Sequence, residues 1–187
     1  MIKTMKRAIV GSAAALAMLA GGAAQAVTLD VSGFPTGYFG STVAVAPQAT
    51  ITSFGSDLYF GGADSRPNSF CAIGSGCAAD MEIDFNDLVE NLTFTVGGYG
   101  TGDMIEVLAY DASDVLLGSV TKASAGLVDL SGFSPISRIF IDDSSTAAGF
   151  GYDEVTWDIA SGTVPVPAPL PLLAAGLGLL ALAKRRR

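Results

Sequence analysis

The chain has 187 residues, of which 50% are hydrophobic and 15% are charged. This composition excludes a disordered acidic chain, which is poor in apolar residues, and the absence of a long heptad run excludes a coiled coil. Three basic residues lie within the first seven positions, and residues 184–187 are four more. All 18 acidic residues and the remaining three basic residues lie in the segment 27–162, whose net charge is therefore −15. So acidic a segment repels phosphate backbones, which argues against nucleic acid as a partner.

The first 26 residues have the pattern of a secretory signal peptide. Three basic residues precede an apolar run over residues 8–20, and Ala24 and Ala26 occupy the two small-residue positions of a signal cleavage site. The apolar run is too short to favour the alternative of an uncleaved membrane anchor. We therefore expect a signal helix over residues 1–26 that is removed after Ala26, so that the mature chain begins at Val27.

Short runs of alternating apolar and polar residues, separated by Gly, Ser, Asp and Pro, fill the segment 27–162. The clearest run places Leu92, Phe94 and Val96 on one face of an extended chain. Helix-like spacing is confined to residues 85–90. Many short strands in succession predict an all-β domain, an antiparallel β-sandwich with one core. Its strands are expected at residues 28–32, 43–45, 50–54, 58–60, 81–85, 92–96, 105–109, 115–121, 127–130, 136–142 and 152–159.

Tyr38 and Tyr99 lie in or beside glycine-rich turns, where an aromatic ring is available to stack on a sugar. Phe39, Tyr59 and Phe60 are placed in the same way, but core filling competes with binding for all of them. Trp157 is expected in the core, because its neighbours along the strand are apolar. The aromatic residues therefore make a carbohydrate-binding module an alternative function, with Tyr38 and Tyr99 as its candidate ligand-binding residues.

Cys71 and Cys77 are the two cysteines of the chain and lie in a loop that contains Gly and Ser. An even number of cysteines in an exported chain favours a disulfide. A metal-binding pair is the alternative, but the chain has no His and no second cysteine pair to complete a zinc site. We therefore expect a Cys71–Cys77 disulfide that fixes the loop before the strand at 81–85.

Asp80, Glu82 and Asp84 alternate in the sequence, so that on a strand they share one face. A row of carboxylates is a potential calcium site, because calcium prefers oxygen ligands. The alternative is the solvated face of an amphipathic strand, which is the commoner case. The spacing does not fit an EF-hand, since Phe85 stands where that loop has a Gly.

Asp142, Asp143 and Asp153 flank the loop 144–151 and form a second candidate calcium site. The competing explanation is turn chemistry, in which Asp side chains accept hydrogen bonds from nearby backbone N–H groups and end strands. We give turn chemistry the greater weight, so that no cofactor is expected and calcium remains the alternative.

The absence of His excludes Ser-His-Asp and Cys-His catalysis within this chain. Glycoside hydrolysis needs only two carboxylates, and 18 acidic residues provide many pairs, so a carboxylate-dependent glycosidase remains a further alternative. Such abundance makes any single pair uninformative. We therefore expect a non-catalytic protein.

The C-terminal segment 163–187 combines a proline motif, the apolar run 172–183 and four basic residues at 184–187. The prolines hold an exposed, extended segment, the apolar run is able to form a transmembrane helix, and the basic residues remain cytoplasmic. A simple membrane anchor would not need the prolines, and a helix over 170–183 would be only about 20 Å long at 1.5 Å per residue. The motif consists of Val164, Pro165, Val166, Pro167 and Ala168.

This segment resembles the VPLPA-CTERM sorting signal, a variant of the PEP-CTERM class of exported bacterial proteins, with Val166 in place of the usual Leu. The resemblance implies an exosortase, a membrane-embedded processing enzyme, as a partner that cuts near the motif. It also implies a chain that is tethered to the inner membrane before processing and then passes to the cell surface or extracellular matrix. Such proteins are often associated with exopolysaccharide.

The body has a second resemblance, to the jelly-roll sandwich that is common among PEP-CTERM proteins and similar to galactose-binding-like domains. This likeness implies a domain of a kind that often binds carbohydrate without catalysis. We therefore expect a non-catalytic exported protein of the surface or matrix, with the single folded domain at 27–162. The resemblance is carried by the runs at residues 108–112, 115–118, 128–133, 136–141 and 151–157.

Overall fold

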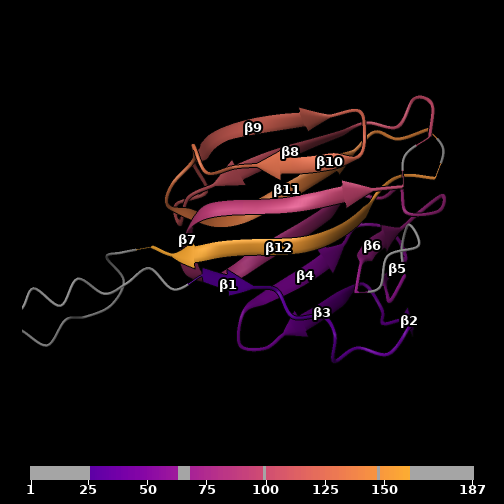
Figure 1. Ribbon diagram of the computed structural model, residues 1–187, viewed down its shortest axis with the longest axis horizontal. Coiled ribbons are helices and arrows are strands. Elements are labelled where there is room, and N and C mark those ends of the chain that lie inside the picture. Colours follow the sequence, from indigo (N-terminus) through magenta and orange to yellow (C-terminus); the bar gives the residue numbers. More distant parts are fainter. Residues whose placement is uncertain (1–25, 63–67, 99, 147, 161–187) are drawn as a thin grey trace, which may run out of the picture.

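A computed structural model describes residues 26–62, 68–98, 100–146 and 148–160 of the chain, and these ranges form strands and loops (Figure 1). No helix occurs among them, and hence none there has the length and apolar character that a membrane crossing requires. The expected signal helix and the expected C-terminal transmembrane helix both lie outside the described residues.

Twelve strands account for most of the described chain, and every pairing between them is antiparallel. The prediction of an all-β antiparallel domain is therefore confirmed. The strands are β1 (Ala26–Thr28), β2 (Gly37–Tyr38), β3 (Thr42–Val45), β4 (Ala49–Ser53), β5 (Asp57–Phe60), β6 (Phe70–Ile73), β7 (Met81–Gly97), β8 (Ile105–Tyr110), β9 (Leu116–Lys122), β10 (Gly126–Asp129), β11 (Ile136–Asp143) and β12 (Gly151–Ile159).

The long strand β7 corrects the sequence prediction, which expected separate strands at 81–85 and 92–96 with helix-like spacing at 85–90. All three segments form one strand of 17 residues. Its buried positions are odd-numbered up to Val89 and even-numbered from Leu92 to Val96. The change occurs at Asn91, whose φ of 54° lies in the left-handed region that Asn tolerates better than most residues. This change of phase exchanges the side chains that face the core with those that face solvent, so the strand lacks the simple alternation on which the prediction relied.

Strand β7 belongs to two sets of strands that share one hydrophobic core. Its first half pairs with β4 and β11, and its second half pairs with β10 and β12. One set therefore has the order β3-β4-β7-β11-β8-β9, and the other has the order β10-β7-β12-β6-β5-β2, with β1 added to β12. The bend of β7 between the two sets is visible in Figure 1. Inward side chains of both sets form a single cluster, so the sequence folds as a two-layer arrangement around one core.

Strand β6 was not expected, because the sequence prediction treated its residues as part of the cysteine loop. Phe70, Cys71 and Ala72 are all buried, so the strand lacks the period of two that identifies a half-exposed strand. Phe70 lies in a series of aromatic contacts between Phe60 and Tyr152, each with ring centroids 5.9 Å apart. The series holds β5, β6 and β12 together on the inner side of the sheet.

Candidate binding surfaces around β6 and β12

Tyr38 lies in a row of side chains that crosses three strands. It is the register partner of Tyr59 on β5, and Tyr59 is the partner of Cys71 on β6. Register partners of an antiparallel sheet project to the same face, so the three side chains are neighbours on one side. The rings of Tyr38 and Tyr59 are 5.1 Å apart between centroids, and 67% of Tyr38 is exposed. The structure thus presents Tyr38 as an accessible ring, while Tyr99 lies outside the described residues.

The backbone around Tyr38 is held in place although β2 has only two residues. The N–H of Phe39 donates to the Leu58 carbonyl over 3.0 Å, and the N–H of Leu58 donates to the Gly40 carbonyl over 2.8 Å. On the opposite side of the sheet, Phe39 and Phe60 pack edge to face with centroids 5.4 Å apart. Phe60 is therefore part of the core and Phe39 packs against it, so the strand segment that bears the exposed Tyr38 is packed on its inner side.

The predicted Cys71–Cys77 disulfide is confirmed, with Cα atoms 5.4 Å apart. It joins β6 to the loop before β7, and the N–H of Cys77 donates to the Ala148 carbonyl over 2.8 Å. Gly149 has a φ of 71°, and a Cβ atom at this position would lie 2.3 Å from the Cys77 carbonyl oxygen. The disulfide therefore fastens the aromatic row to the segment that leads into β12.

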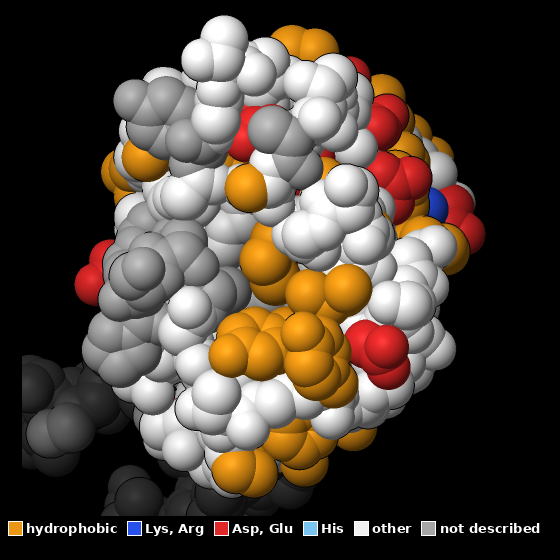
Figure 2. All heavy atoms as spheres, turned by 90° about the vertical axis from the view of Figure 1, so that its right-hand side faces the viewer, with side chains coloured by type: hydrophobic (Ala, Val, Ile, Leu, Met, Phe, Trp, Pro, Cys, Tyr) orange, Lys and Arg blue, Asp and Glu red, His pale blue; other side chains and the backbone are white. Residues whose placement is uncertain are grey.

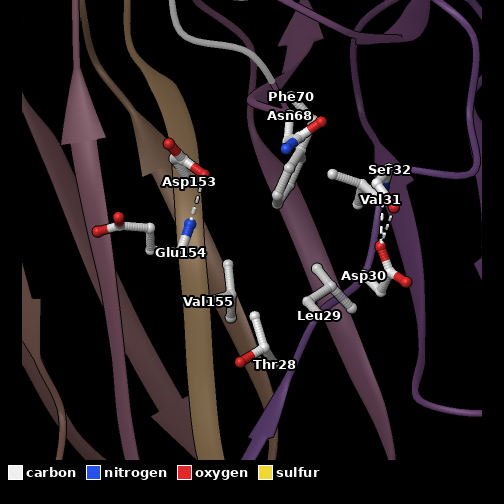
Figure 3. Close-up of a pocket in the computed structure, with 10 residues that line it drawn as sticks. All are labelled: Thr28, Leu29, Asp30, Val31, Ser32, Asn68, Phe70, Asp153, Glu154 and Val155. Atoms are coloured by element: carbon white, nitrogen blue, oxygen red, sulfur yellow. Dashed lines mark hydrogen bonds between the residues drawn. The ribbon is translucent and has the colours of Figure 1, made fainter.

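A cavity of about 600 Å³ opens where β12 changes its neighbour on one edge. At Tyr152 that edge pairs with β6, whereas from Thr156 to Asp158 it pairs with β1. At Asp153 and Glu154 this edge of β12 pairs with neither strand, and the gap is surrounded by residues of β12, of the segment that follows β1 and of the start of β6 (Figure 3). The lining is formed by Thr28, Leu29, Asp30, Val31, Ser32, Asn68, Phe70, Asp153, Glu154 and Val155.

Asp30 and Asp153 accept hydrogen bonds within their own turns, whereas Glu154 accepts one from the Thr95 hydroxyl at 3.1 Å. Asp30 accepts from the hydroxyl of Ser32 at 2.6 Å and from its N–H at 3.0 Å, and these bonds lower the pKa of Asp30. Asp153 accepts from the N–H of Glu154 at 2.7 Å. Figure 3 shows the Glu154 side chain turned away from Asp30. The lowered pKa means that Asp30 stays ionised at neutral pH, and its hydrogen bonds to Ser32 are those of a turn.

The three residues of the candidate calcium site do not share one location. Asp142 and Asp143 end β11, whereas Asp153 lines the cavity. The Asp143 Oδ1 atom makes a turn contact, in which it accepts from the Ser145 N–H over 2.9 Å, and the Asp143 N–H donates to the distant Asp80 side chain over 2.9 Å. In the part of the chain that the structure describes, no three acidic or cysteine side chains converge as a metal-binding group. These contacts are of the kind that turn chemistry predicts, and calcium binding stays the alternative that the structure does not test.

Asp143 also lies in a partly buried acidic environment. Burial raises the pKa of its carboxyl group, and the charges of Asp103 and Asp80 raise it further, while the bonds from Ser145 oppose them. Its Oδ2 atom is buried without a hydrogen-bond partner, as is the hydroxyl of Tyr152. Burial is also the main cause that raises the pKa of Tyr152.

The acidic row on β7 has two different environments. Asp80 contacts Asp143, whereas Glu82 and Asp84 project to the outer face of the sheet, where Glu82 is 2.9 Å from the Arg138 guanidinium. Burial and the neighbouring Asp84 together raise the pKa of Glu82, against the effect of Arg138. Sequence analysis missed this contact. The signal that could have placed Arg138 on the outer face is its alternation with the apolar Ile139 and Ile141.

A second aromatic pair lies on the outer face of the β4–β11 set, where Phe54 and Phe140 have ring centroids 5.5 Å apart. Phe54 is 59% exposed and follows β4 directly.

Figure 2 shows hydrophobic side chains gathered on the end of the molecule that carries β5 and β6 in Figure 1, with acidic side chains beside them. Sequence analysis placed Phe54 in a strand and did not identify it as an exposed ring. Because its ring is exposed, Phe54 is a second aromatic side chain against which binding at Tyr38 is compared.

The residues of the expected processing sites are described only in part. Ala26 and Val27 begin β1, whereas Ala24 lies outside the described residues. The five residues of the proline motif, Val164, Pro165, Val166, Pro167 and Ala168, lie outside them as well.

No family model and no curated protein matches the chain. Among solved structures, it is similar to a DUF4465 family protein from Bacteroides caccae, with 10% identity, a TM-score of 0.45, and coverage of 73% of this chain and 100% of that one. It is also similar to a variant of a family 29 carbohydrate-binding module, with 15% identity, a TM-score of 0.35, and coverage of 73% and 93%. A further family 29 module has 13% identity, a TM-score of 0.34, and coverage of 73% and 89%. Scores and identities this low assign no function to the chain.

Proposed function

We propose that the chain is a non-catalytic exported protein of the cell surface or extracellular matrix, whose folded domain binds polysaccharide through Tyr38 and Tyr59. Export is supported by the signal-like N-terminus and by the Cys71–Cys77 disulfide, since disulfides persist in oxidising compartments. The resemblance of residues 164–187 to a VPLPA-CTERM signal supports processing by an exosortase, after a stage in which the chain is tethered to the inner membrane.

The observation that carries the binding proposal is the exposed Tyr38–Tyr59 pair. A tyrosine ring offers an apolar face to the C–H groups of a sugar and a hydroxyl group to its oxygens. Tyr38 is accessible and Tyr59 is half-buried beside it. Backbone hydrogen bonds of Leu58 with Phe39 and Gly40 hold the adjoining segments together. A support that is ordered before binding loses less conformational entropy when the ligand arrives.

Asp57 adds a polar group to the same face. It lies two residues before Tyr59 on β5, and successive odd positions of a strand share one side of the sheet. Its carboxylate is an acceptor for sugar hydroxyls next to the ring. A ring with an acceptor beside it suits a neutral or amine-bearing polysaccharide, whereas the acidic body repels a polyanion.

The proposal is tested by affinity electrophoresis in gels that contain the polysaccharide isolated from the matrix of the producing cells, with a soluble glucan as a reference polymer. The substitution Tyr38→Ala is expected to weaken retention about tenfold, which corresponds to the roughly 1.4 kcal/mol that one stacked ring contributes. Phe54→Ala is the matched control, because it removes an exposed ring elsewhere. Equal retention of the two variants and the unaltered protein would contradict binding at Tyr38.

A further inference from the structure

The strand β1 begins where the mature chain is expected to begin. Ala26, Val27 and Thr28 pair with Asp158, Trp157 and Thr156 of β12. The peptide bond between Ala26 and Val27 is therefore part of a paired strand. A processing protease needs an extended segment free on both sides, so cleavage at this bond has to precede the pairing of β1 with β12. Figure 1 shows that β1 starts beside the end of β12.

The end of β12 carries an unfavourable charge arrangement. Asp158 is the register partner of Glu90 on β7, so that two carboxylates are neighbours on the same face of the sheet. Like charges directly opposite each other destabilise a strand pair. Asp158 accepts one hydrogen bond, from the Asn91 side-chain amide at 2.9 Å, and this donor is neutral.

The described basic residues do not compensate this pair. Arg138 contacts Glu82 and Asp114, and Lys122 lies on β9 as the register partner of Ile105. Strand β9 is at the edge of the other set of strands. Within the described ranges, no salt bridge therefore joins a lysine or arginine to Asp158 or Glu90.

Cleavage after Ala26 places a cation at this location. The N–H of Leu29 donates to the Val155 carbonyl over 2.8 Å, and every second residue of a strand presents its N–H to the same neighbour. The nitrogen of Val27 therefore faces β12, beside Trp157 and Asp158. When Val27 becomes the first residue, this nitrogen is an α-ammonium group, with an ordinary pKa of about 7.7–8.0.

We propose that the amino terminus created by cleavage after Ala26 is a structural part of the domain, in which the Val27 α-ammonium group pairs with Asp158 and relieves its repulsion with Glu90. The inference rests on the proposed export, which supplies the cleavage. The uncleaved chain has a neutral peptide nitrogen at the same place. Processing thus stabilises the β1–β12 pair in addition to releasing the signal peptide.

The test compares two chains released from a fusion partner, one beginning at Val27 and one beginning at Ala24, both ending at Arg187. They keep the same number of charges, but in the second the α-ammonium group lies three residues away and Ala26 keeps its pairing with Asp158, which favours the second chain. The chain that begins at Val27 is expected to melt at least about 2 °C higher. Asp158→Asn should lower the melting temperature of the Val27 chain relative to that of the Ala24 chain, and Glu90→Gln should raise the melting temperature of the Ala24 chain more than that of the Val27 chain.

Equal melting temperatures, or an equal effect of Asp158→Asn in both chains, would overturn the inference. Glu106→Gln is the control for a general effect of charge, because Glu106 lies on β8 in the other set of strands. The proposed export is judged separately, by the N-terminal residue of the protein recovered from cells. A cellular chain that retains residues 1–26 would contradict export, whereas the melting comparison would still decide whether Asp158 binds the new terminus.

Discussion

Cys71 lies directly opposite Tyr59 in the register of β5 and β6, so the disulfide to Cys77 is part of the row of side chains that ends in the exposed Tyr38. The small cysteine loop and the aromatic surface are thus one structural unit. Its inner side is closed by the contacts of Phe60 with Phe70, so the unit has a covalent link on one face and packed aromatic rings on the other.

The first prediction concerns this covalent link. The double substitution Cys71→Ala and Cys77→Ala is expected to lower the free energy of unfolding by about 2 kcal/mol, because the disulfide closes a short loop in the unfolded chain. Urea denaturation measures the change, with the oxidised and the reduced unaltered protein as references. A double variant as stable as the oxidised protein would show that the disulfide does not restrain β6.

The second prediction concerns Asp143, whose pKa is raised by burial and by the nearby carboxylates Asp103 and Asp80. A carboxyl group with a raised pKa binds protons more readily in the folded state, so its contribution to stability falls as the pH rises through the folded pKa. Asp143→Asn is therefore expected to stabilise the domain at pH 7, by no more than about 1 kcal/mol, because part of the group is screened by solvent.

The same variant is expected to lose its advantage in acid, where the carboxyl group of the unaltered protein is protonated. The side-chain amide oxygen of the variant would still accept the hydrogen bond from the Ser145 N–H, so the turn should remain intact. Thermal unfolding between pH 3 and pH 8 measures both effects. An Asp143→Asn variant that is less stable than the unaltered protein at pH 7 would contradict the assigned cause of the pKa shift.

The third prediction concerns Gly149, at the junction between the cysteine loop and β12. Gly149→Ala is expected to destabilise the domain by more than about 2 kcal/mol, because its Cβ would lie 2.3 Å from the Cys77 carbonyl oxygen and its φ of 71° disfavours Ala. Gly132→Ala is the matched control, since a Cβ at that position meets no atom within 4 Å. Similar melting temperatures for the two variants would show that the two segments are not in close contact.

The sequence was sufficient for the fold class, because alternation is visible wherever one face of a strand is exposed. It failed at the strand expected at 28–32, where β1 ends at Thr28, and at β2, which has only two residues. It also failed at β6, where both faces are covered, and at β7, where Asn91 changes the phase of the alternation. For the candidate site, Tyr38 and the disulfide were accessible to sequence reasoning through turn residues and cysteine number. The partnership of Tyr38 with Tyr59 was not, because it depends on the register of β2 against β5. The contact of Arg138 with Glu82 depends on long-range register in the same way.

The central proposal is that the protein is exported and is cleaved after Ala26 and near the motif at residues 164–168. Its most direct test is intact-mass spectrometry, with terminal sequencing, of the protein isolated from the cell surface and matrix of the producing cells. The account predicts a chain that begins at Val27 and lacks the basic residues 184–187. A full-length chain that retains Met1 and Arg187 would contradict it.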